Sequence, residues 1–150
     1  MKSLCNLLYL VFTLAIGTLP GCGGGSNRQL QSLSVSPAST TAQGGQAQFT
    51  ATGQFTAAPM SVSPASVAWF QSPPVFDPPS SMIGITPTNQ PFMAQCFGFP
   101  SGTTITISAI APMDGKASSV PLSVFLDLVR EHTATQENGF VAATATMKCP

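Results

Sequence analysis

The sequence predicts an all-β sandwich or barrel that follows an export signal, and three features of the 150-residue chain support this expectation. Apolar and polar residues alternate with a period of two in several short segments, which is typical of strands with one buried and one solvated face. Turns that contain glycine and proline separate these segments. The 14 prolines also disfavour long helices. We therefore expect a fold of short strands.

The first segment, residues 1–21, has the order of charge, apolar run and small-residue cleavage site that is typical of a signal peptide. Lys2 precedes the uncharged apolar residues 4–19, which Pro20 and Gly21 follow. This apolar run is shorter than the roughly 20 residues that a membrane-spanning helix needs. We expect residues 1–21 to be removed on export.

The motif Leu19-Pro20-Gly21-Cys22 resembles the lipobox of bacterial lipoproteins, whose cysteine is lipidated and becomes the mature N-terminus. The resemblance implies a lipid anchor on Cys22 in the cell envelope, and Gly23 after it favours the outer membrane or cell surface. Residues 22–29 then form a glycine-rich, flexible tether. The alternative is plain secretion, because Ala15-Ile16-Gly17 fits an ordinary signal peptidase site.

The strand signal then recurs along the chain, with turn residues between the segments. In one clear case, Ala47, Phe49 and Ala51 alternate with glutamine and threonine. The predicted strands lie at 33–35, 46–52, 67–71, 83–86 and 104–109. Turn signals lie at 43–45, 72–74, 77–79, 99–102 and 114–115.

The segment 120–130 fits both a strand and a helix. Every second residue is apolar, as in a strand, but four residues also share one helical face: Leu122, Phe125, Leu126 and Val129. Asn138-Gly139 is a hairpin signal. We predict a β-hairpin in which residues 119–131 pair with residues 140–148, and the helix is the alternative.

The cysteine count leaves one possible pairing. Cys5 lies in the export signal, and Cys22 is consumed if it is lipidated. Cys96 and Cys149 remain, in an oxidising compartment where disulfides persist. Their bond would close a loop of about 50 residues and contribute roughly 4 kcal/mol in the chain-entropy model. Two buried free thiols are the alternative, and a single histidine cannot complete a zinc site.

Four segments resemble, in this order, the bacterial Ig-like domain of the group 2 type, which is found in surface adhesins and exported lipoproteins. They are Gln31-Ser32-Leu33-Ser34-Val35-Ser36-Pro37, residues 44–53, Val67-Ala68-Trp69 and residues 102–109. The resemblance implies an Ig-like Greek-key β-sandwich over residues 30–150.

The same resemblance implies places for individual residues. Phe49 and Trp69 belong in the core between the sheets, and Gly53 and Gly102 belong at turns. The segment 116–139 is longer than the usual final connection of the family, so it is an extension of the domain.

Composition excludes several function classes. Charged residues make up 7% of the chain, and its formal net charge is +0. Without a basic stripe, nucleic acid is not an expected partner. Asp127, Glu131 and His132 form the one close cluster of titratable residues, and we interpret them as solvated surface charges. We expect no catalytic residues, metal, cofactor or small-molecule substrate.

The candidate contact surface is apolar and lies in loops. The proline-rich loop 72–81 carries Val75 and Phe76, and Phe97 and Phe99 flank a turn. We expect a non-catalytic envelope lipoprotein that contacts a protein or glycan through these residues. One alternative is an accessory subunit of an envelope complex that docks through residues 116–139. A secreted, hydrolase-like enzyme is a remote alternative.

Overall fold

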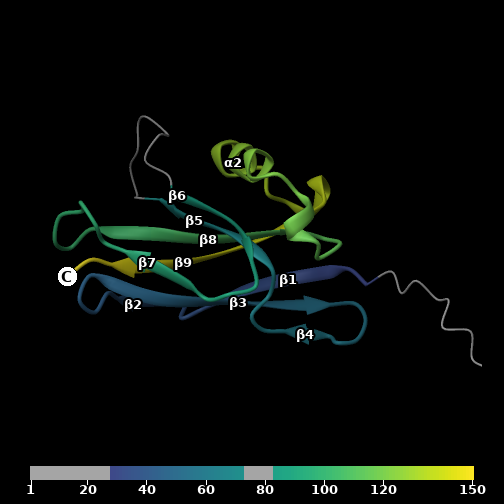
Figure 1. Cartoon of the computed structure of the whole chain (residues 1–150), viewed down its shortest axis with the longest axis horizontal. Helices are drawn as coiled ribbons and strands as arrows, with labels where there is room; N and C mark the ends of the chain where they lie inside the picture. The colour runs from purple at the N-terminus through teal and green to yellow at the C-terminus, as the bar shows by residue number, and fades with distance from the viewer. Residues whose placement is uncertain (1–27, 73–82) are drawn as a thin grey trace, which may run out of the picture.

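The computed structural model describes residues 28–72 and 83–150, which form two β-sheets with few helices (Figure 1). The predicted all-β class is confirmed. The predicted strands at 46–52, 67–71, 83–86 and 104–109 all lie inside observed strands. Residues 1–27, which include Cys22 and most of the predicted tether, lie outside the described residues.

The first sheet is built around one long strand, β3 (Gln46–Phe55). Antiparallel to it run β1 (Leu30–Ser36), β4 (Ser61–Val62) and β7 (Phe92–Gln95). β1 pairs with β3 from Phe55 back to Thr50, whereas β7 pairs with its other end, from Gln46 to Phe49.

The second sheet has the order β2-β9-β8-β5-β6. Its strands are β2 (Ser39–Thr41), β9 (Phe140–Lys148), β8 (Thr104–Pro112), β5 (Val67–Ser72) and β6 (Ile83–Thr88). β2 runs parallel to β9, and the other pairs are antiparallel. The chain therefore leaves the first sheet at the end of β1 and joins the edge of the second sheet three residues later.

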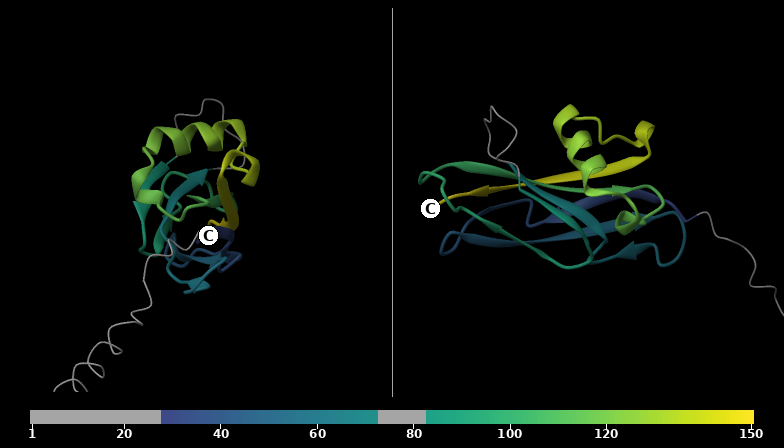
Figure 2. Two further views of the ribbon diagram at one scale, coloured as in Figure 1. Left: turned by 90° about the vertical axis from the view of Figure 1, so that its right-hand side faces the viewer. Right: turned by 45° about the horizontal axis from the view of Figure 1, so that its top comes forward.

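The two sheets lie face to face (Figure 2). Large apolar side chains from both sheets form one buried core. Phe49 and Trp69 are completely buried, as predicted. Trp69 of the second sheet stacks on Phe92 of the first, with the ring centroids 5.4 Å apart. This contact joins the core residues of the two sheets.

The two glycines assigned to turns have different outcomes. Gly102 lies in a turn with a φ of +84°, as predicted. The prediction for Gly53 is wrong, because it lies inside β3 and pairs with Leu33 on one side and Val62 on the other. A Cβ atom there would come within 2.9 Å of Leu30 Cδ1, so close packing accounts for the glycine.

The predicted hairpin of residues 119–131 with residues 140–148 is wrong. Residues Leu122–Glu131 form a helix, α2, between the short 3₁₀ turns η2 (Ala117–Ser119) and η3 (Gln136–Asn138). β9 pairs along its whole length with β8 instead. The helical face with Phe125 packs on the second sheet, and burial of that face outweighs the local strand alternation.

The helix α2 adds a third layer over the outer face of the second sheet (Figure 2). Phe125 is fully buried and meets the Phe140 ring edge-on, with the centroids 5.9 Å apart. The covered outer face explains why five consecutive residues of β5, from Val67 to Gln71, are all buried. A strand with one solvated face would alternate instead.

Gln71 is the one buried polar residue among the described side chains, and both ends of its amide are satisfied. Its Nε2 donates to the Gln95 carbonyl at 2.6 Å, and its Oε1 accepts the Gln95 N–H at 3.0 Å. The Gln71 side chain thus bonds both backbone groups of Gln95, the last residue of β7, as a neighbouring strand would. It also holds that residue to the opposite sheet.

The described chain begins with residues that are already bonded to the domain. The Arg28 guanidinium donates to the carbonyls of Ala57 and Pro59 and lies over the Phe55 ring, 3.6 Å from its centroid. The Gln29 N–H donates to Thr56 Oγ1 at 2.9 Å. The chain is therefore fixed to the sandwich from Arg28 onward.

Candidate contact surfaces at one end of the sandwich

A disulfide joins the two sheets at one end of the sandwich. Cys96 directly follows β7, Cys149 directly follows β9, and the two are bonded with their Cα atoms 5.7 Å apart. Backbone hydrogen bonds continue the connection: Cys96 N–H donates to the Gly45 carbonyl at 2.8 Å, and Cys149 N–H donates to the Thr103 carbonyl at 2.7 Å. The predicted pairing is confirmed, and the disulfide and these two hydrogen bonds together join four chain segments.

The turn after Cys96 presents an aromatic side chain to solvent. Phe97 is 92% exposed. Among the described residues, the other exposed large apolar side chains, those of Met60, Met93 and Val124, are less exposed. Gly98 follows with a φ of +82°, and the Phe99 N–H closes the turn on the Cys96 carbonyl at 3.2 Å. Phe99 is half-buried and packs against the core.

The four residues predicted as a contact surface therefore have different outcomes. Phe97 is free of the core, and Phe99 is partly a core residue. Val75 and Phe76 lie outside the described residues. The strand residues that flank their loop, Ser72 and Ile83, lie toward the disulfide end, since Ser72 pairs with Thr106 near the start of β8.

The disulfide end is the end opposite to the point where the chain enters the domain (Figure 1). At one end of β3, Phe55 pairs with Leu30, and at the other end Gln46 pairs with Gln95. Nine residue steps along a strand span about 30 Å. Phe97 therefore lies about the full length of β3 away from the start of the domain.

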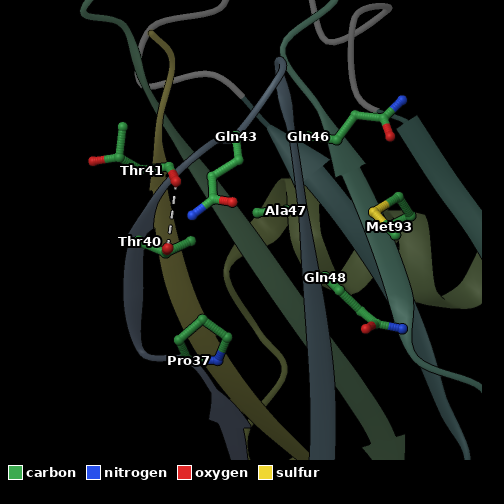
Figure 3. A pocket seen from close by; sticks show the side chains of 8 residues that line it. All are labelled: Pro37, Thr40, Thr41, Gln43, Gln46, Ala47, Gln48 and Met93. Carbon is green, nitrogen blue, oxygen red and sulfur yellow. Dashed lines mark hydrogen bonds between the residues drawn. The ribbon is translucent and has the colours of Figure 1, made fainter.

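A shallow groove of about 380 Å³ lies beside this end, between β2 and the first half of β3 (Figure 3). Its walls come from the link between β1 and β2, from β2 and the turn after it, from the start of β3 and from β7. The lining residues are Pro37, Thr40, Thr41, Gln43, Gln46, Ala47, Gln48 and Met93. All eight side chains are uncharged, and five end in an amide or a hydroxyl group.

Charge is distributed very unevenly over the described residues. Between Gln29 and Met113 they include no acidic, basic or histidine side chain. Most charged side chains lie in the segment 114–137, which includes α2. Among the described residues, the disulfide end carries one charged side chain, Lys148, and presents the exposed apolar side chain of Phe97 beside neutral polar groups.

The titratable cluster on α2 has the geometry of a solvated surface. Asp127 and Arg130 lie 3.9 Å apart, with half or more of each side chain exposed, so their attraction is weak. His132 ends the helix in a left-handed conformation, with a φ of +54°. Over residues 28–72 and 83–150, no three His, Cys, Asp or Glu residues are grouped to hold a metal ion.

In the same described ranges, no helix combines the length and the apolar character required to span a membrane.

Comparisons with protein-family models, with curated proteins and with solved structures yield no match to this chain.

Proposed function

We propose that this chain is a non-catalytic lipoprotein of the cell envelope, anchored through Cys22, whose Ig-like sandwich presents a binding surface at its far end. The observation that carries this proposal is the 92% exposure of Phe97 on a turn that a disulfide holds in place. Burying a phenylalanine side chain in a partner contributes about 1.5–3 kcal/mol. Because the turn is already ordered, little entropy is lost when it docks.

The position of Phe97 supports the same proposal. Residues 22–27 would connect a lipid on Cys22 to Arg28, where the domain begins. The disulfide end lies about 30 Å from that point, the length of β3. In an anchored molecule this end is available to a protein or glycan beyond the membrane surface, whereas the entry end faces the anchor.

The segment 116–139 supports the accessory-subunit alternative less well. Its main apolar side chain, Phe125, is buried against the second sheet and is not available to a partner. Val124 is the exposed apolar residue of α2, with 38% of its surface accessible. The tip residue Phe97 offers a much larger exposed apolar surface.

Lipidation is tested by replacing the candidate cysteine. We expect Cys22→Ser to abolish incorporation of a radiolabelled fatty acid and to release the protein from the membrane fraction, because Cys22 would carry the lipid. Cys5→Ser is the matched control and should keep both the label and the membrane location. Label retained by Cys22→Ser, or a leader that remains uncut, would contradict the anchor.

The tip is tested by site-specific photocrosslinking in intact cells. A photoreactive residue at position 97 should give a discrete crosslinked product, and one at position 124 of α2 should not. Phe97→Ser should weaken the captured interaction by at least about tenfold, since aromatic hot spots contribute 2 kcal/mol or more. A product at position 124 alone would favour docking through residues 116–139 and reject the tip.

A further inference from the structure

The groove between β2 and β3 is distinct from the Phe97 turn and has its own chemistry. Three glutamines, Gln43, Gln46 and Gln48, and two threonines line it; the side chains of Gln46 and Gln48 extend from one side of β3, and those of Gln43 and the threonines lie on the other side (Figure 3). Each amide offers both donors and an acceptor. Met93, 46% exposed, adds an apolar surface beside them. The volume of about 380 Å³ lies within the range of about 300–1,000 Å³ that is typical of small-ligand sites.

The groove exists because the chain changes sheets. The pairing of β1 with β3 ends at Ser36 and Thr50, after which the chain crosses to β9 as β2. The residues of β3 before Thr50 pair with β7 on one side and have no strand on the other side within the described residues. The open side of this half-strand forms one wall of the groove.

The peptide groups along this open side are too few to pair with an added strand. The Gly45 carbonyl faces β7, so the groups of Gln46 and Gln48 face the open side, following the alternation of an antiparallel ladder. Gln46 exchanges both hydrogen bonds with Gln43, at 2.9 and 3.1 Å, which leaves only the groups of Gln48. The opposite wall, β2, has only three residues, whereas strands usually have about 5–6.

Recognition in this groove therefore depends on its side chains. The polar side chains are neutral, and they can both donate and accept hydrogen bonds, which fits the hydroxyl groups of a sugar. The apolar side chain of Met93 fits an apolar face of a sugar ring. None of the eight lining residues is charged, and the one cation beside the groove among the described residues is Lys148, the strand partner of Thr41. We propose that the groove binds a neutral saccharide. This inference goes beyond the docking of Phe97 and does not depend on it.

The test uses the full chain, purified in a mild detergent, and three tetrasaccharides. Two are neutral, built of β-1,4-linked glucose or N-acetylglucosamine, and one is a charged tetragalacturonate. Titration calorimetry should show that at least one neutral probe binds with a Kd below about 1 mM, and that the charged probe binds at least tenfold more weakly.

Substitutions then locate the site. Gln48→Ala should weaken binding of the neutral probe about five- to tenfold, the effect of losing about one hydrogen bond. Gln54→Ala is the matched control, since Gln54 is exposed on the same strand but bonds Ser61 at the entry end. It should bind the probe as the unmodified chain does, and so should Phe97→Ser.

Three outcomes would overturn the proposal: binding of neither neutral probe, equal effects of Gln48→Ala and Gln54→Ala, or equal binding of the charged probe. If Phe97→Ser abolishes saccharide binding while Gln48→Ala does not, the site is the turn and not the groove. The absence of a crosslink at position 97 would reject the Phe97 contact surface and would not bear on saccharide binding in the groove. The two proposals are therefore tested independently.

Discussion

Replacing both Cys96 and Cys149 with serine is expected to lower the free energy of unfolding by about 4 kcal/mol. The cysteines are 53 residues apart in sequence, so their bond removes much of the freedom of the unfolded chain. Urea titration can follow this loss through the fluorescence of Trp69, the single tryptophan, which is buried against Phe92. The corresponding fall in melting temperature is about 10–20 °C.

Two controls separate the effect of the crosslink from the effect of the substitution. The unmodified chain, unfolded with a reductant present, should match the double variant. Cys5→Ser with Cys22→Ser should unfold like the unmodified chain, because neither cysteine belongs to the crosslink. A loss below about 1 kcal/mol in the double variant would show that the loop-closure argument does not hold for this domain.

The Cys96–Cys149 disulfide also lies next to the candidate contact residue Phe97. Cys96 lies between Gln95, which the buried Gln71 side chain holds through two hydrogen bonds, and the exposed Phe97. With the crosslink removed, the Gln71 amide still fixes the residue before the turn. The disulfide and the Gln71 amide therefore both hold the turn, one on each side of the Cys96 peptide group.

Local pattern was enough to predict the longer strands, but it missed the short strands β2, β4 and β7 and did not predict which strands pair. The alternation of Ala47, Phe49 and Ala51 places their side chains inside the sandwich, and all but the half-buried Ala47 are fully covered. The step of the chain from β1 to β9 depends on contacts with residues more than 100 positions away, such as Ser39 with Thr146. A period-two pattern carries no information about such a partner.

The candidate site was predictable to a similar degree. The count of cysteines identified the Cys96–Cys149 pair, and the aromatic residues near it drew attention to Phe97. The groove was missed. The spacing of Gln46 and Gln48 places both on one face of a strand, but only the missing strand beside that half of β3 makes the face a groove.

The helix α2 was mispredicted because its sequence satisfies both periods, and tertiary packing decides between them. Leu122, Phe125 and Val129 face one way only in a helix, and that face covers the outer side of the second sheet. In the structure β9 pairs with β8 along its whole length, and the helix packs on the outer side of the second sheet against β6.

Removing the side chain that anchors this helix is the second prediction with a large effect. Phe125→Ala is expected to destabilise the domain by about 3–5 kcal/mol, as for other fully buried phenylalanines. The side chain is 0% exposed and loses its edge-on contact with Phe140. Val124→Ala, at the neighbouring position with 38% exposure, is the matched control and should change the free energy of unfolding by no more than about 0.5 kcal/mol.

Hydrogen exchange distinguishes a loose helix from a weakened domain. Because α2 covers one sheet from outside, its loss leaves the core between the sheets, with Phe49 and Trp69, in place. In Phe125→Ala, the amides of Leu122–Glu131 should therefore exchange faster than those of β3 and β8, whose protection should fall only with global stability. Equal acceleration in α2 and β3 would mean that the helix and the two sheets unfold as one unit, contrary to this layered arrangement.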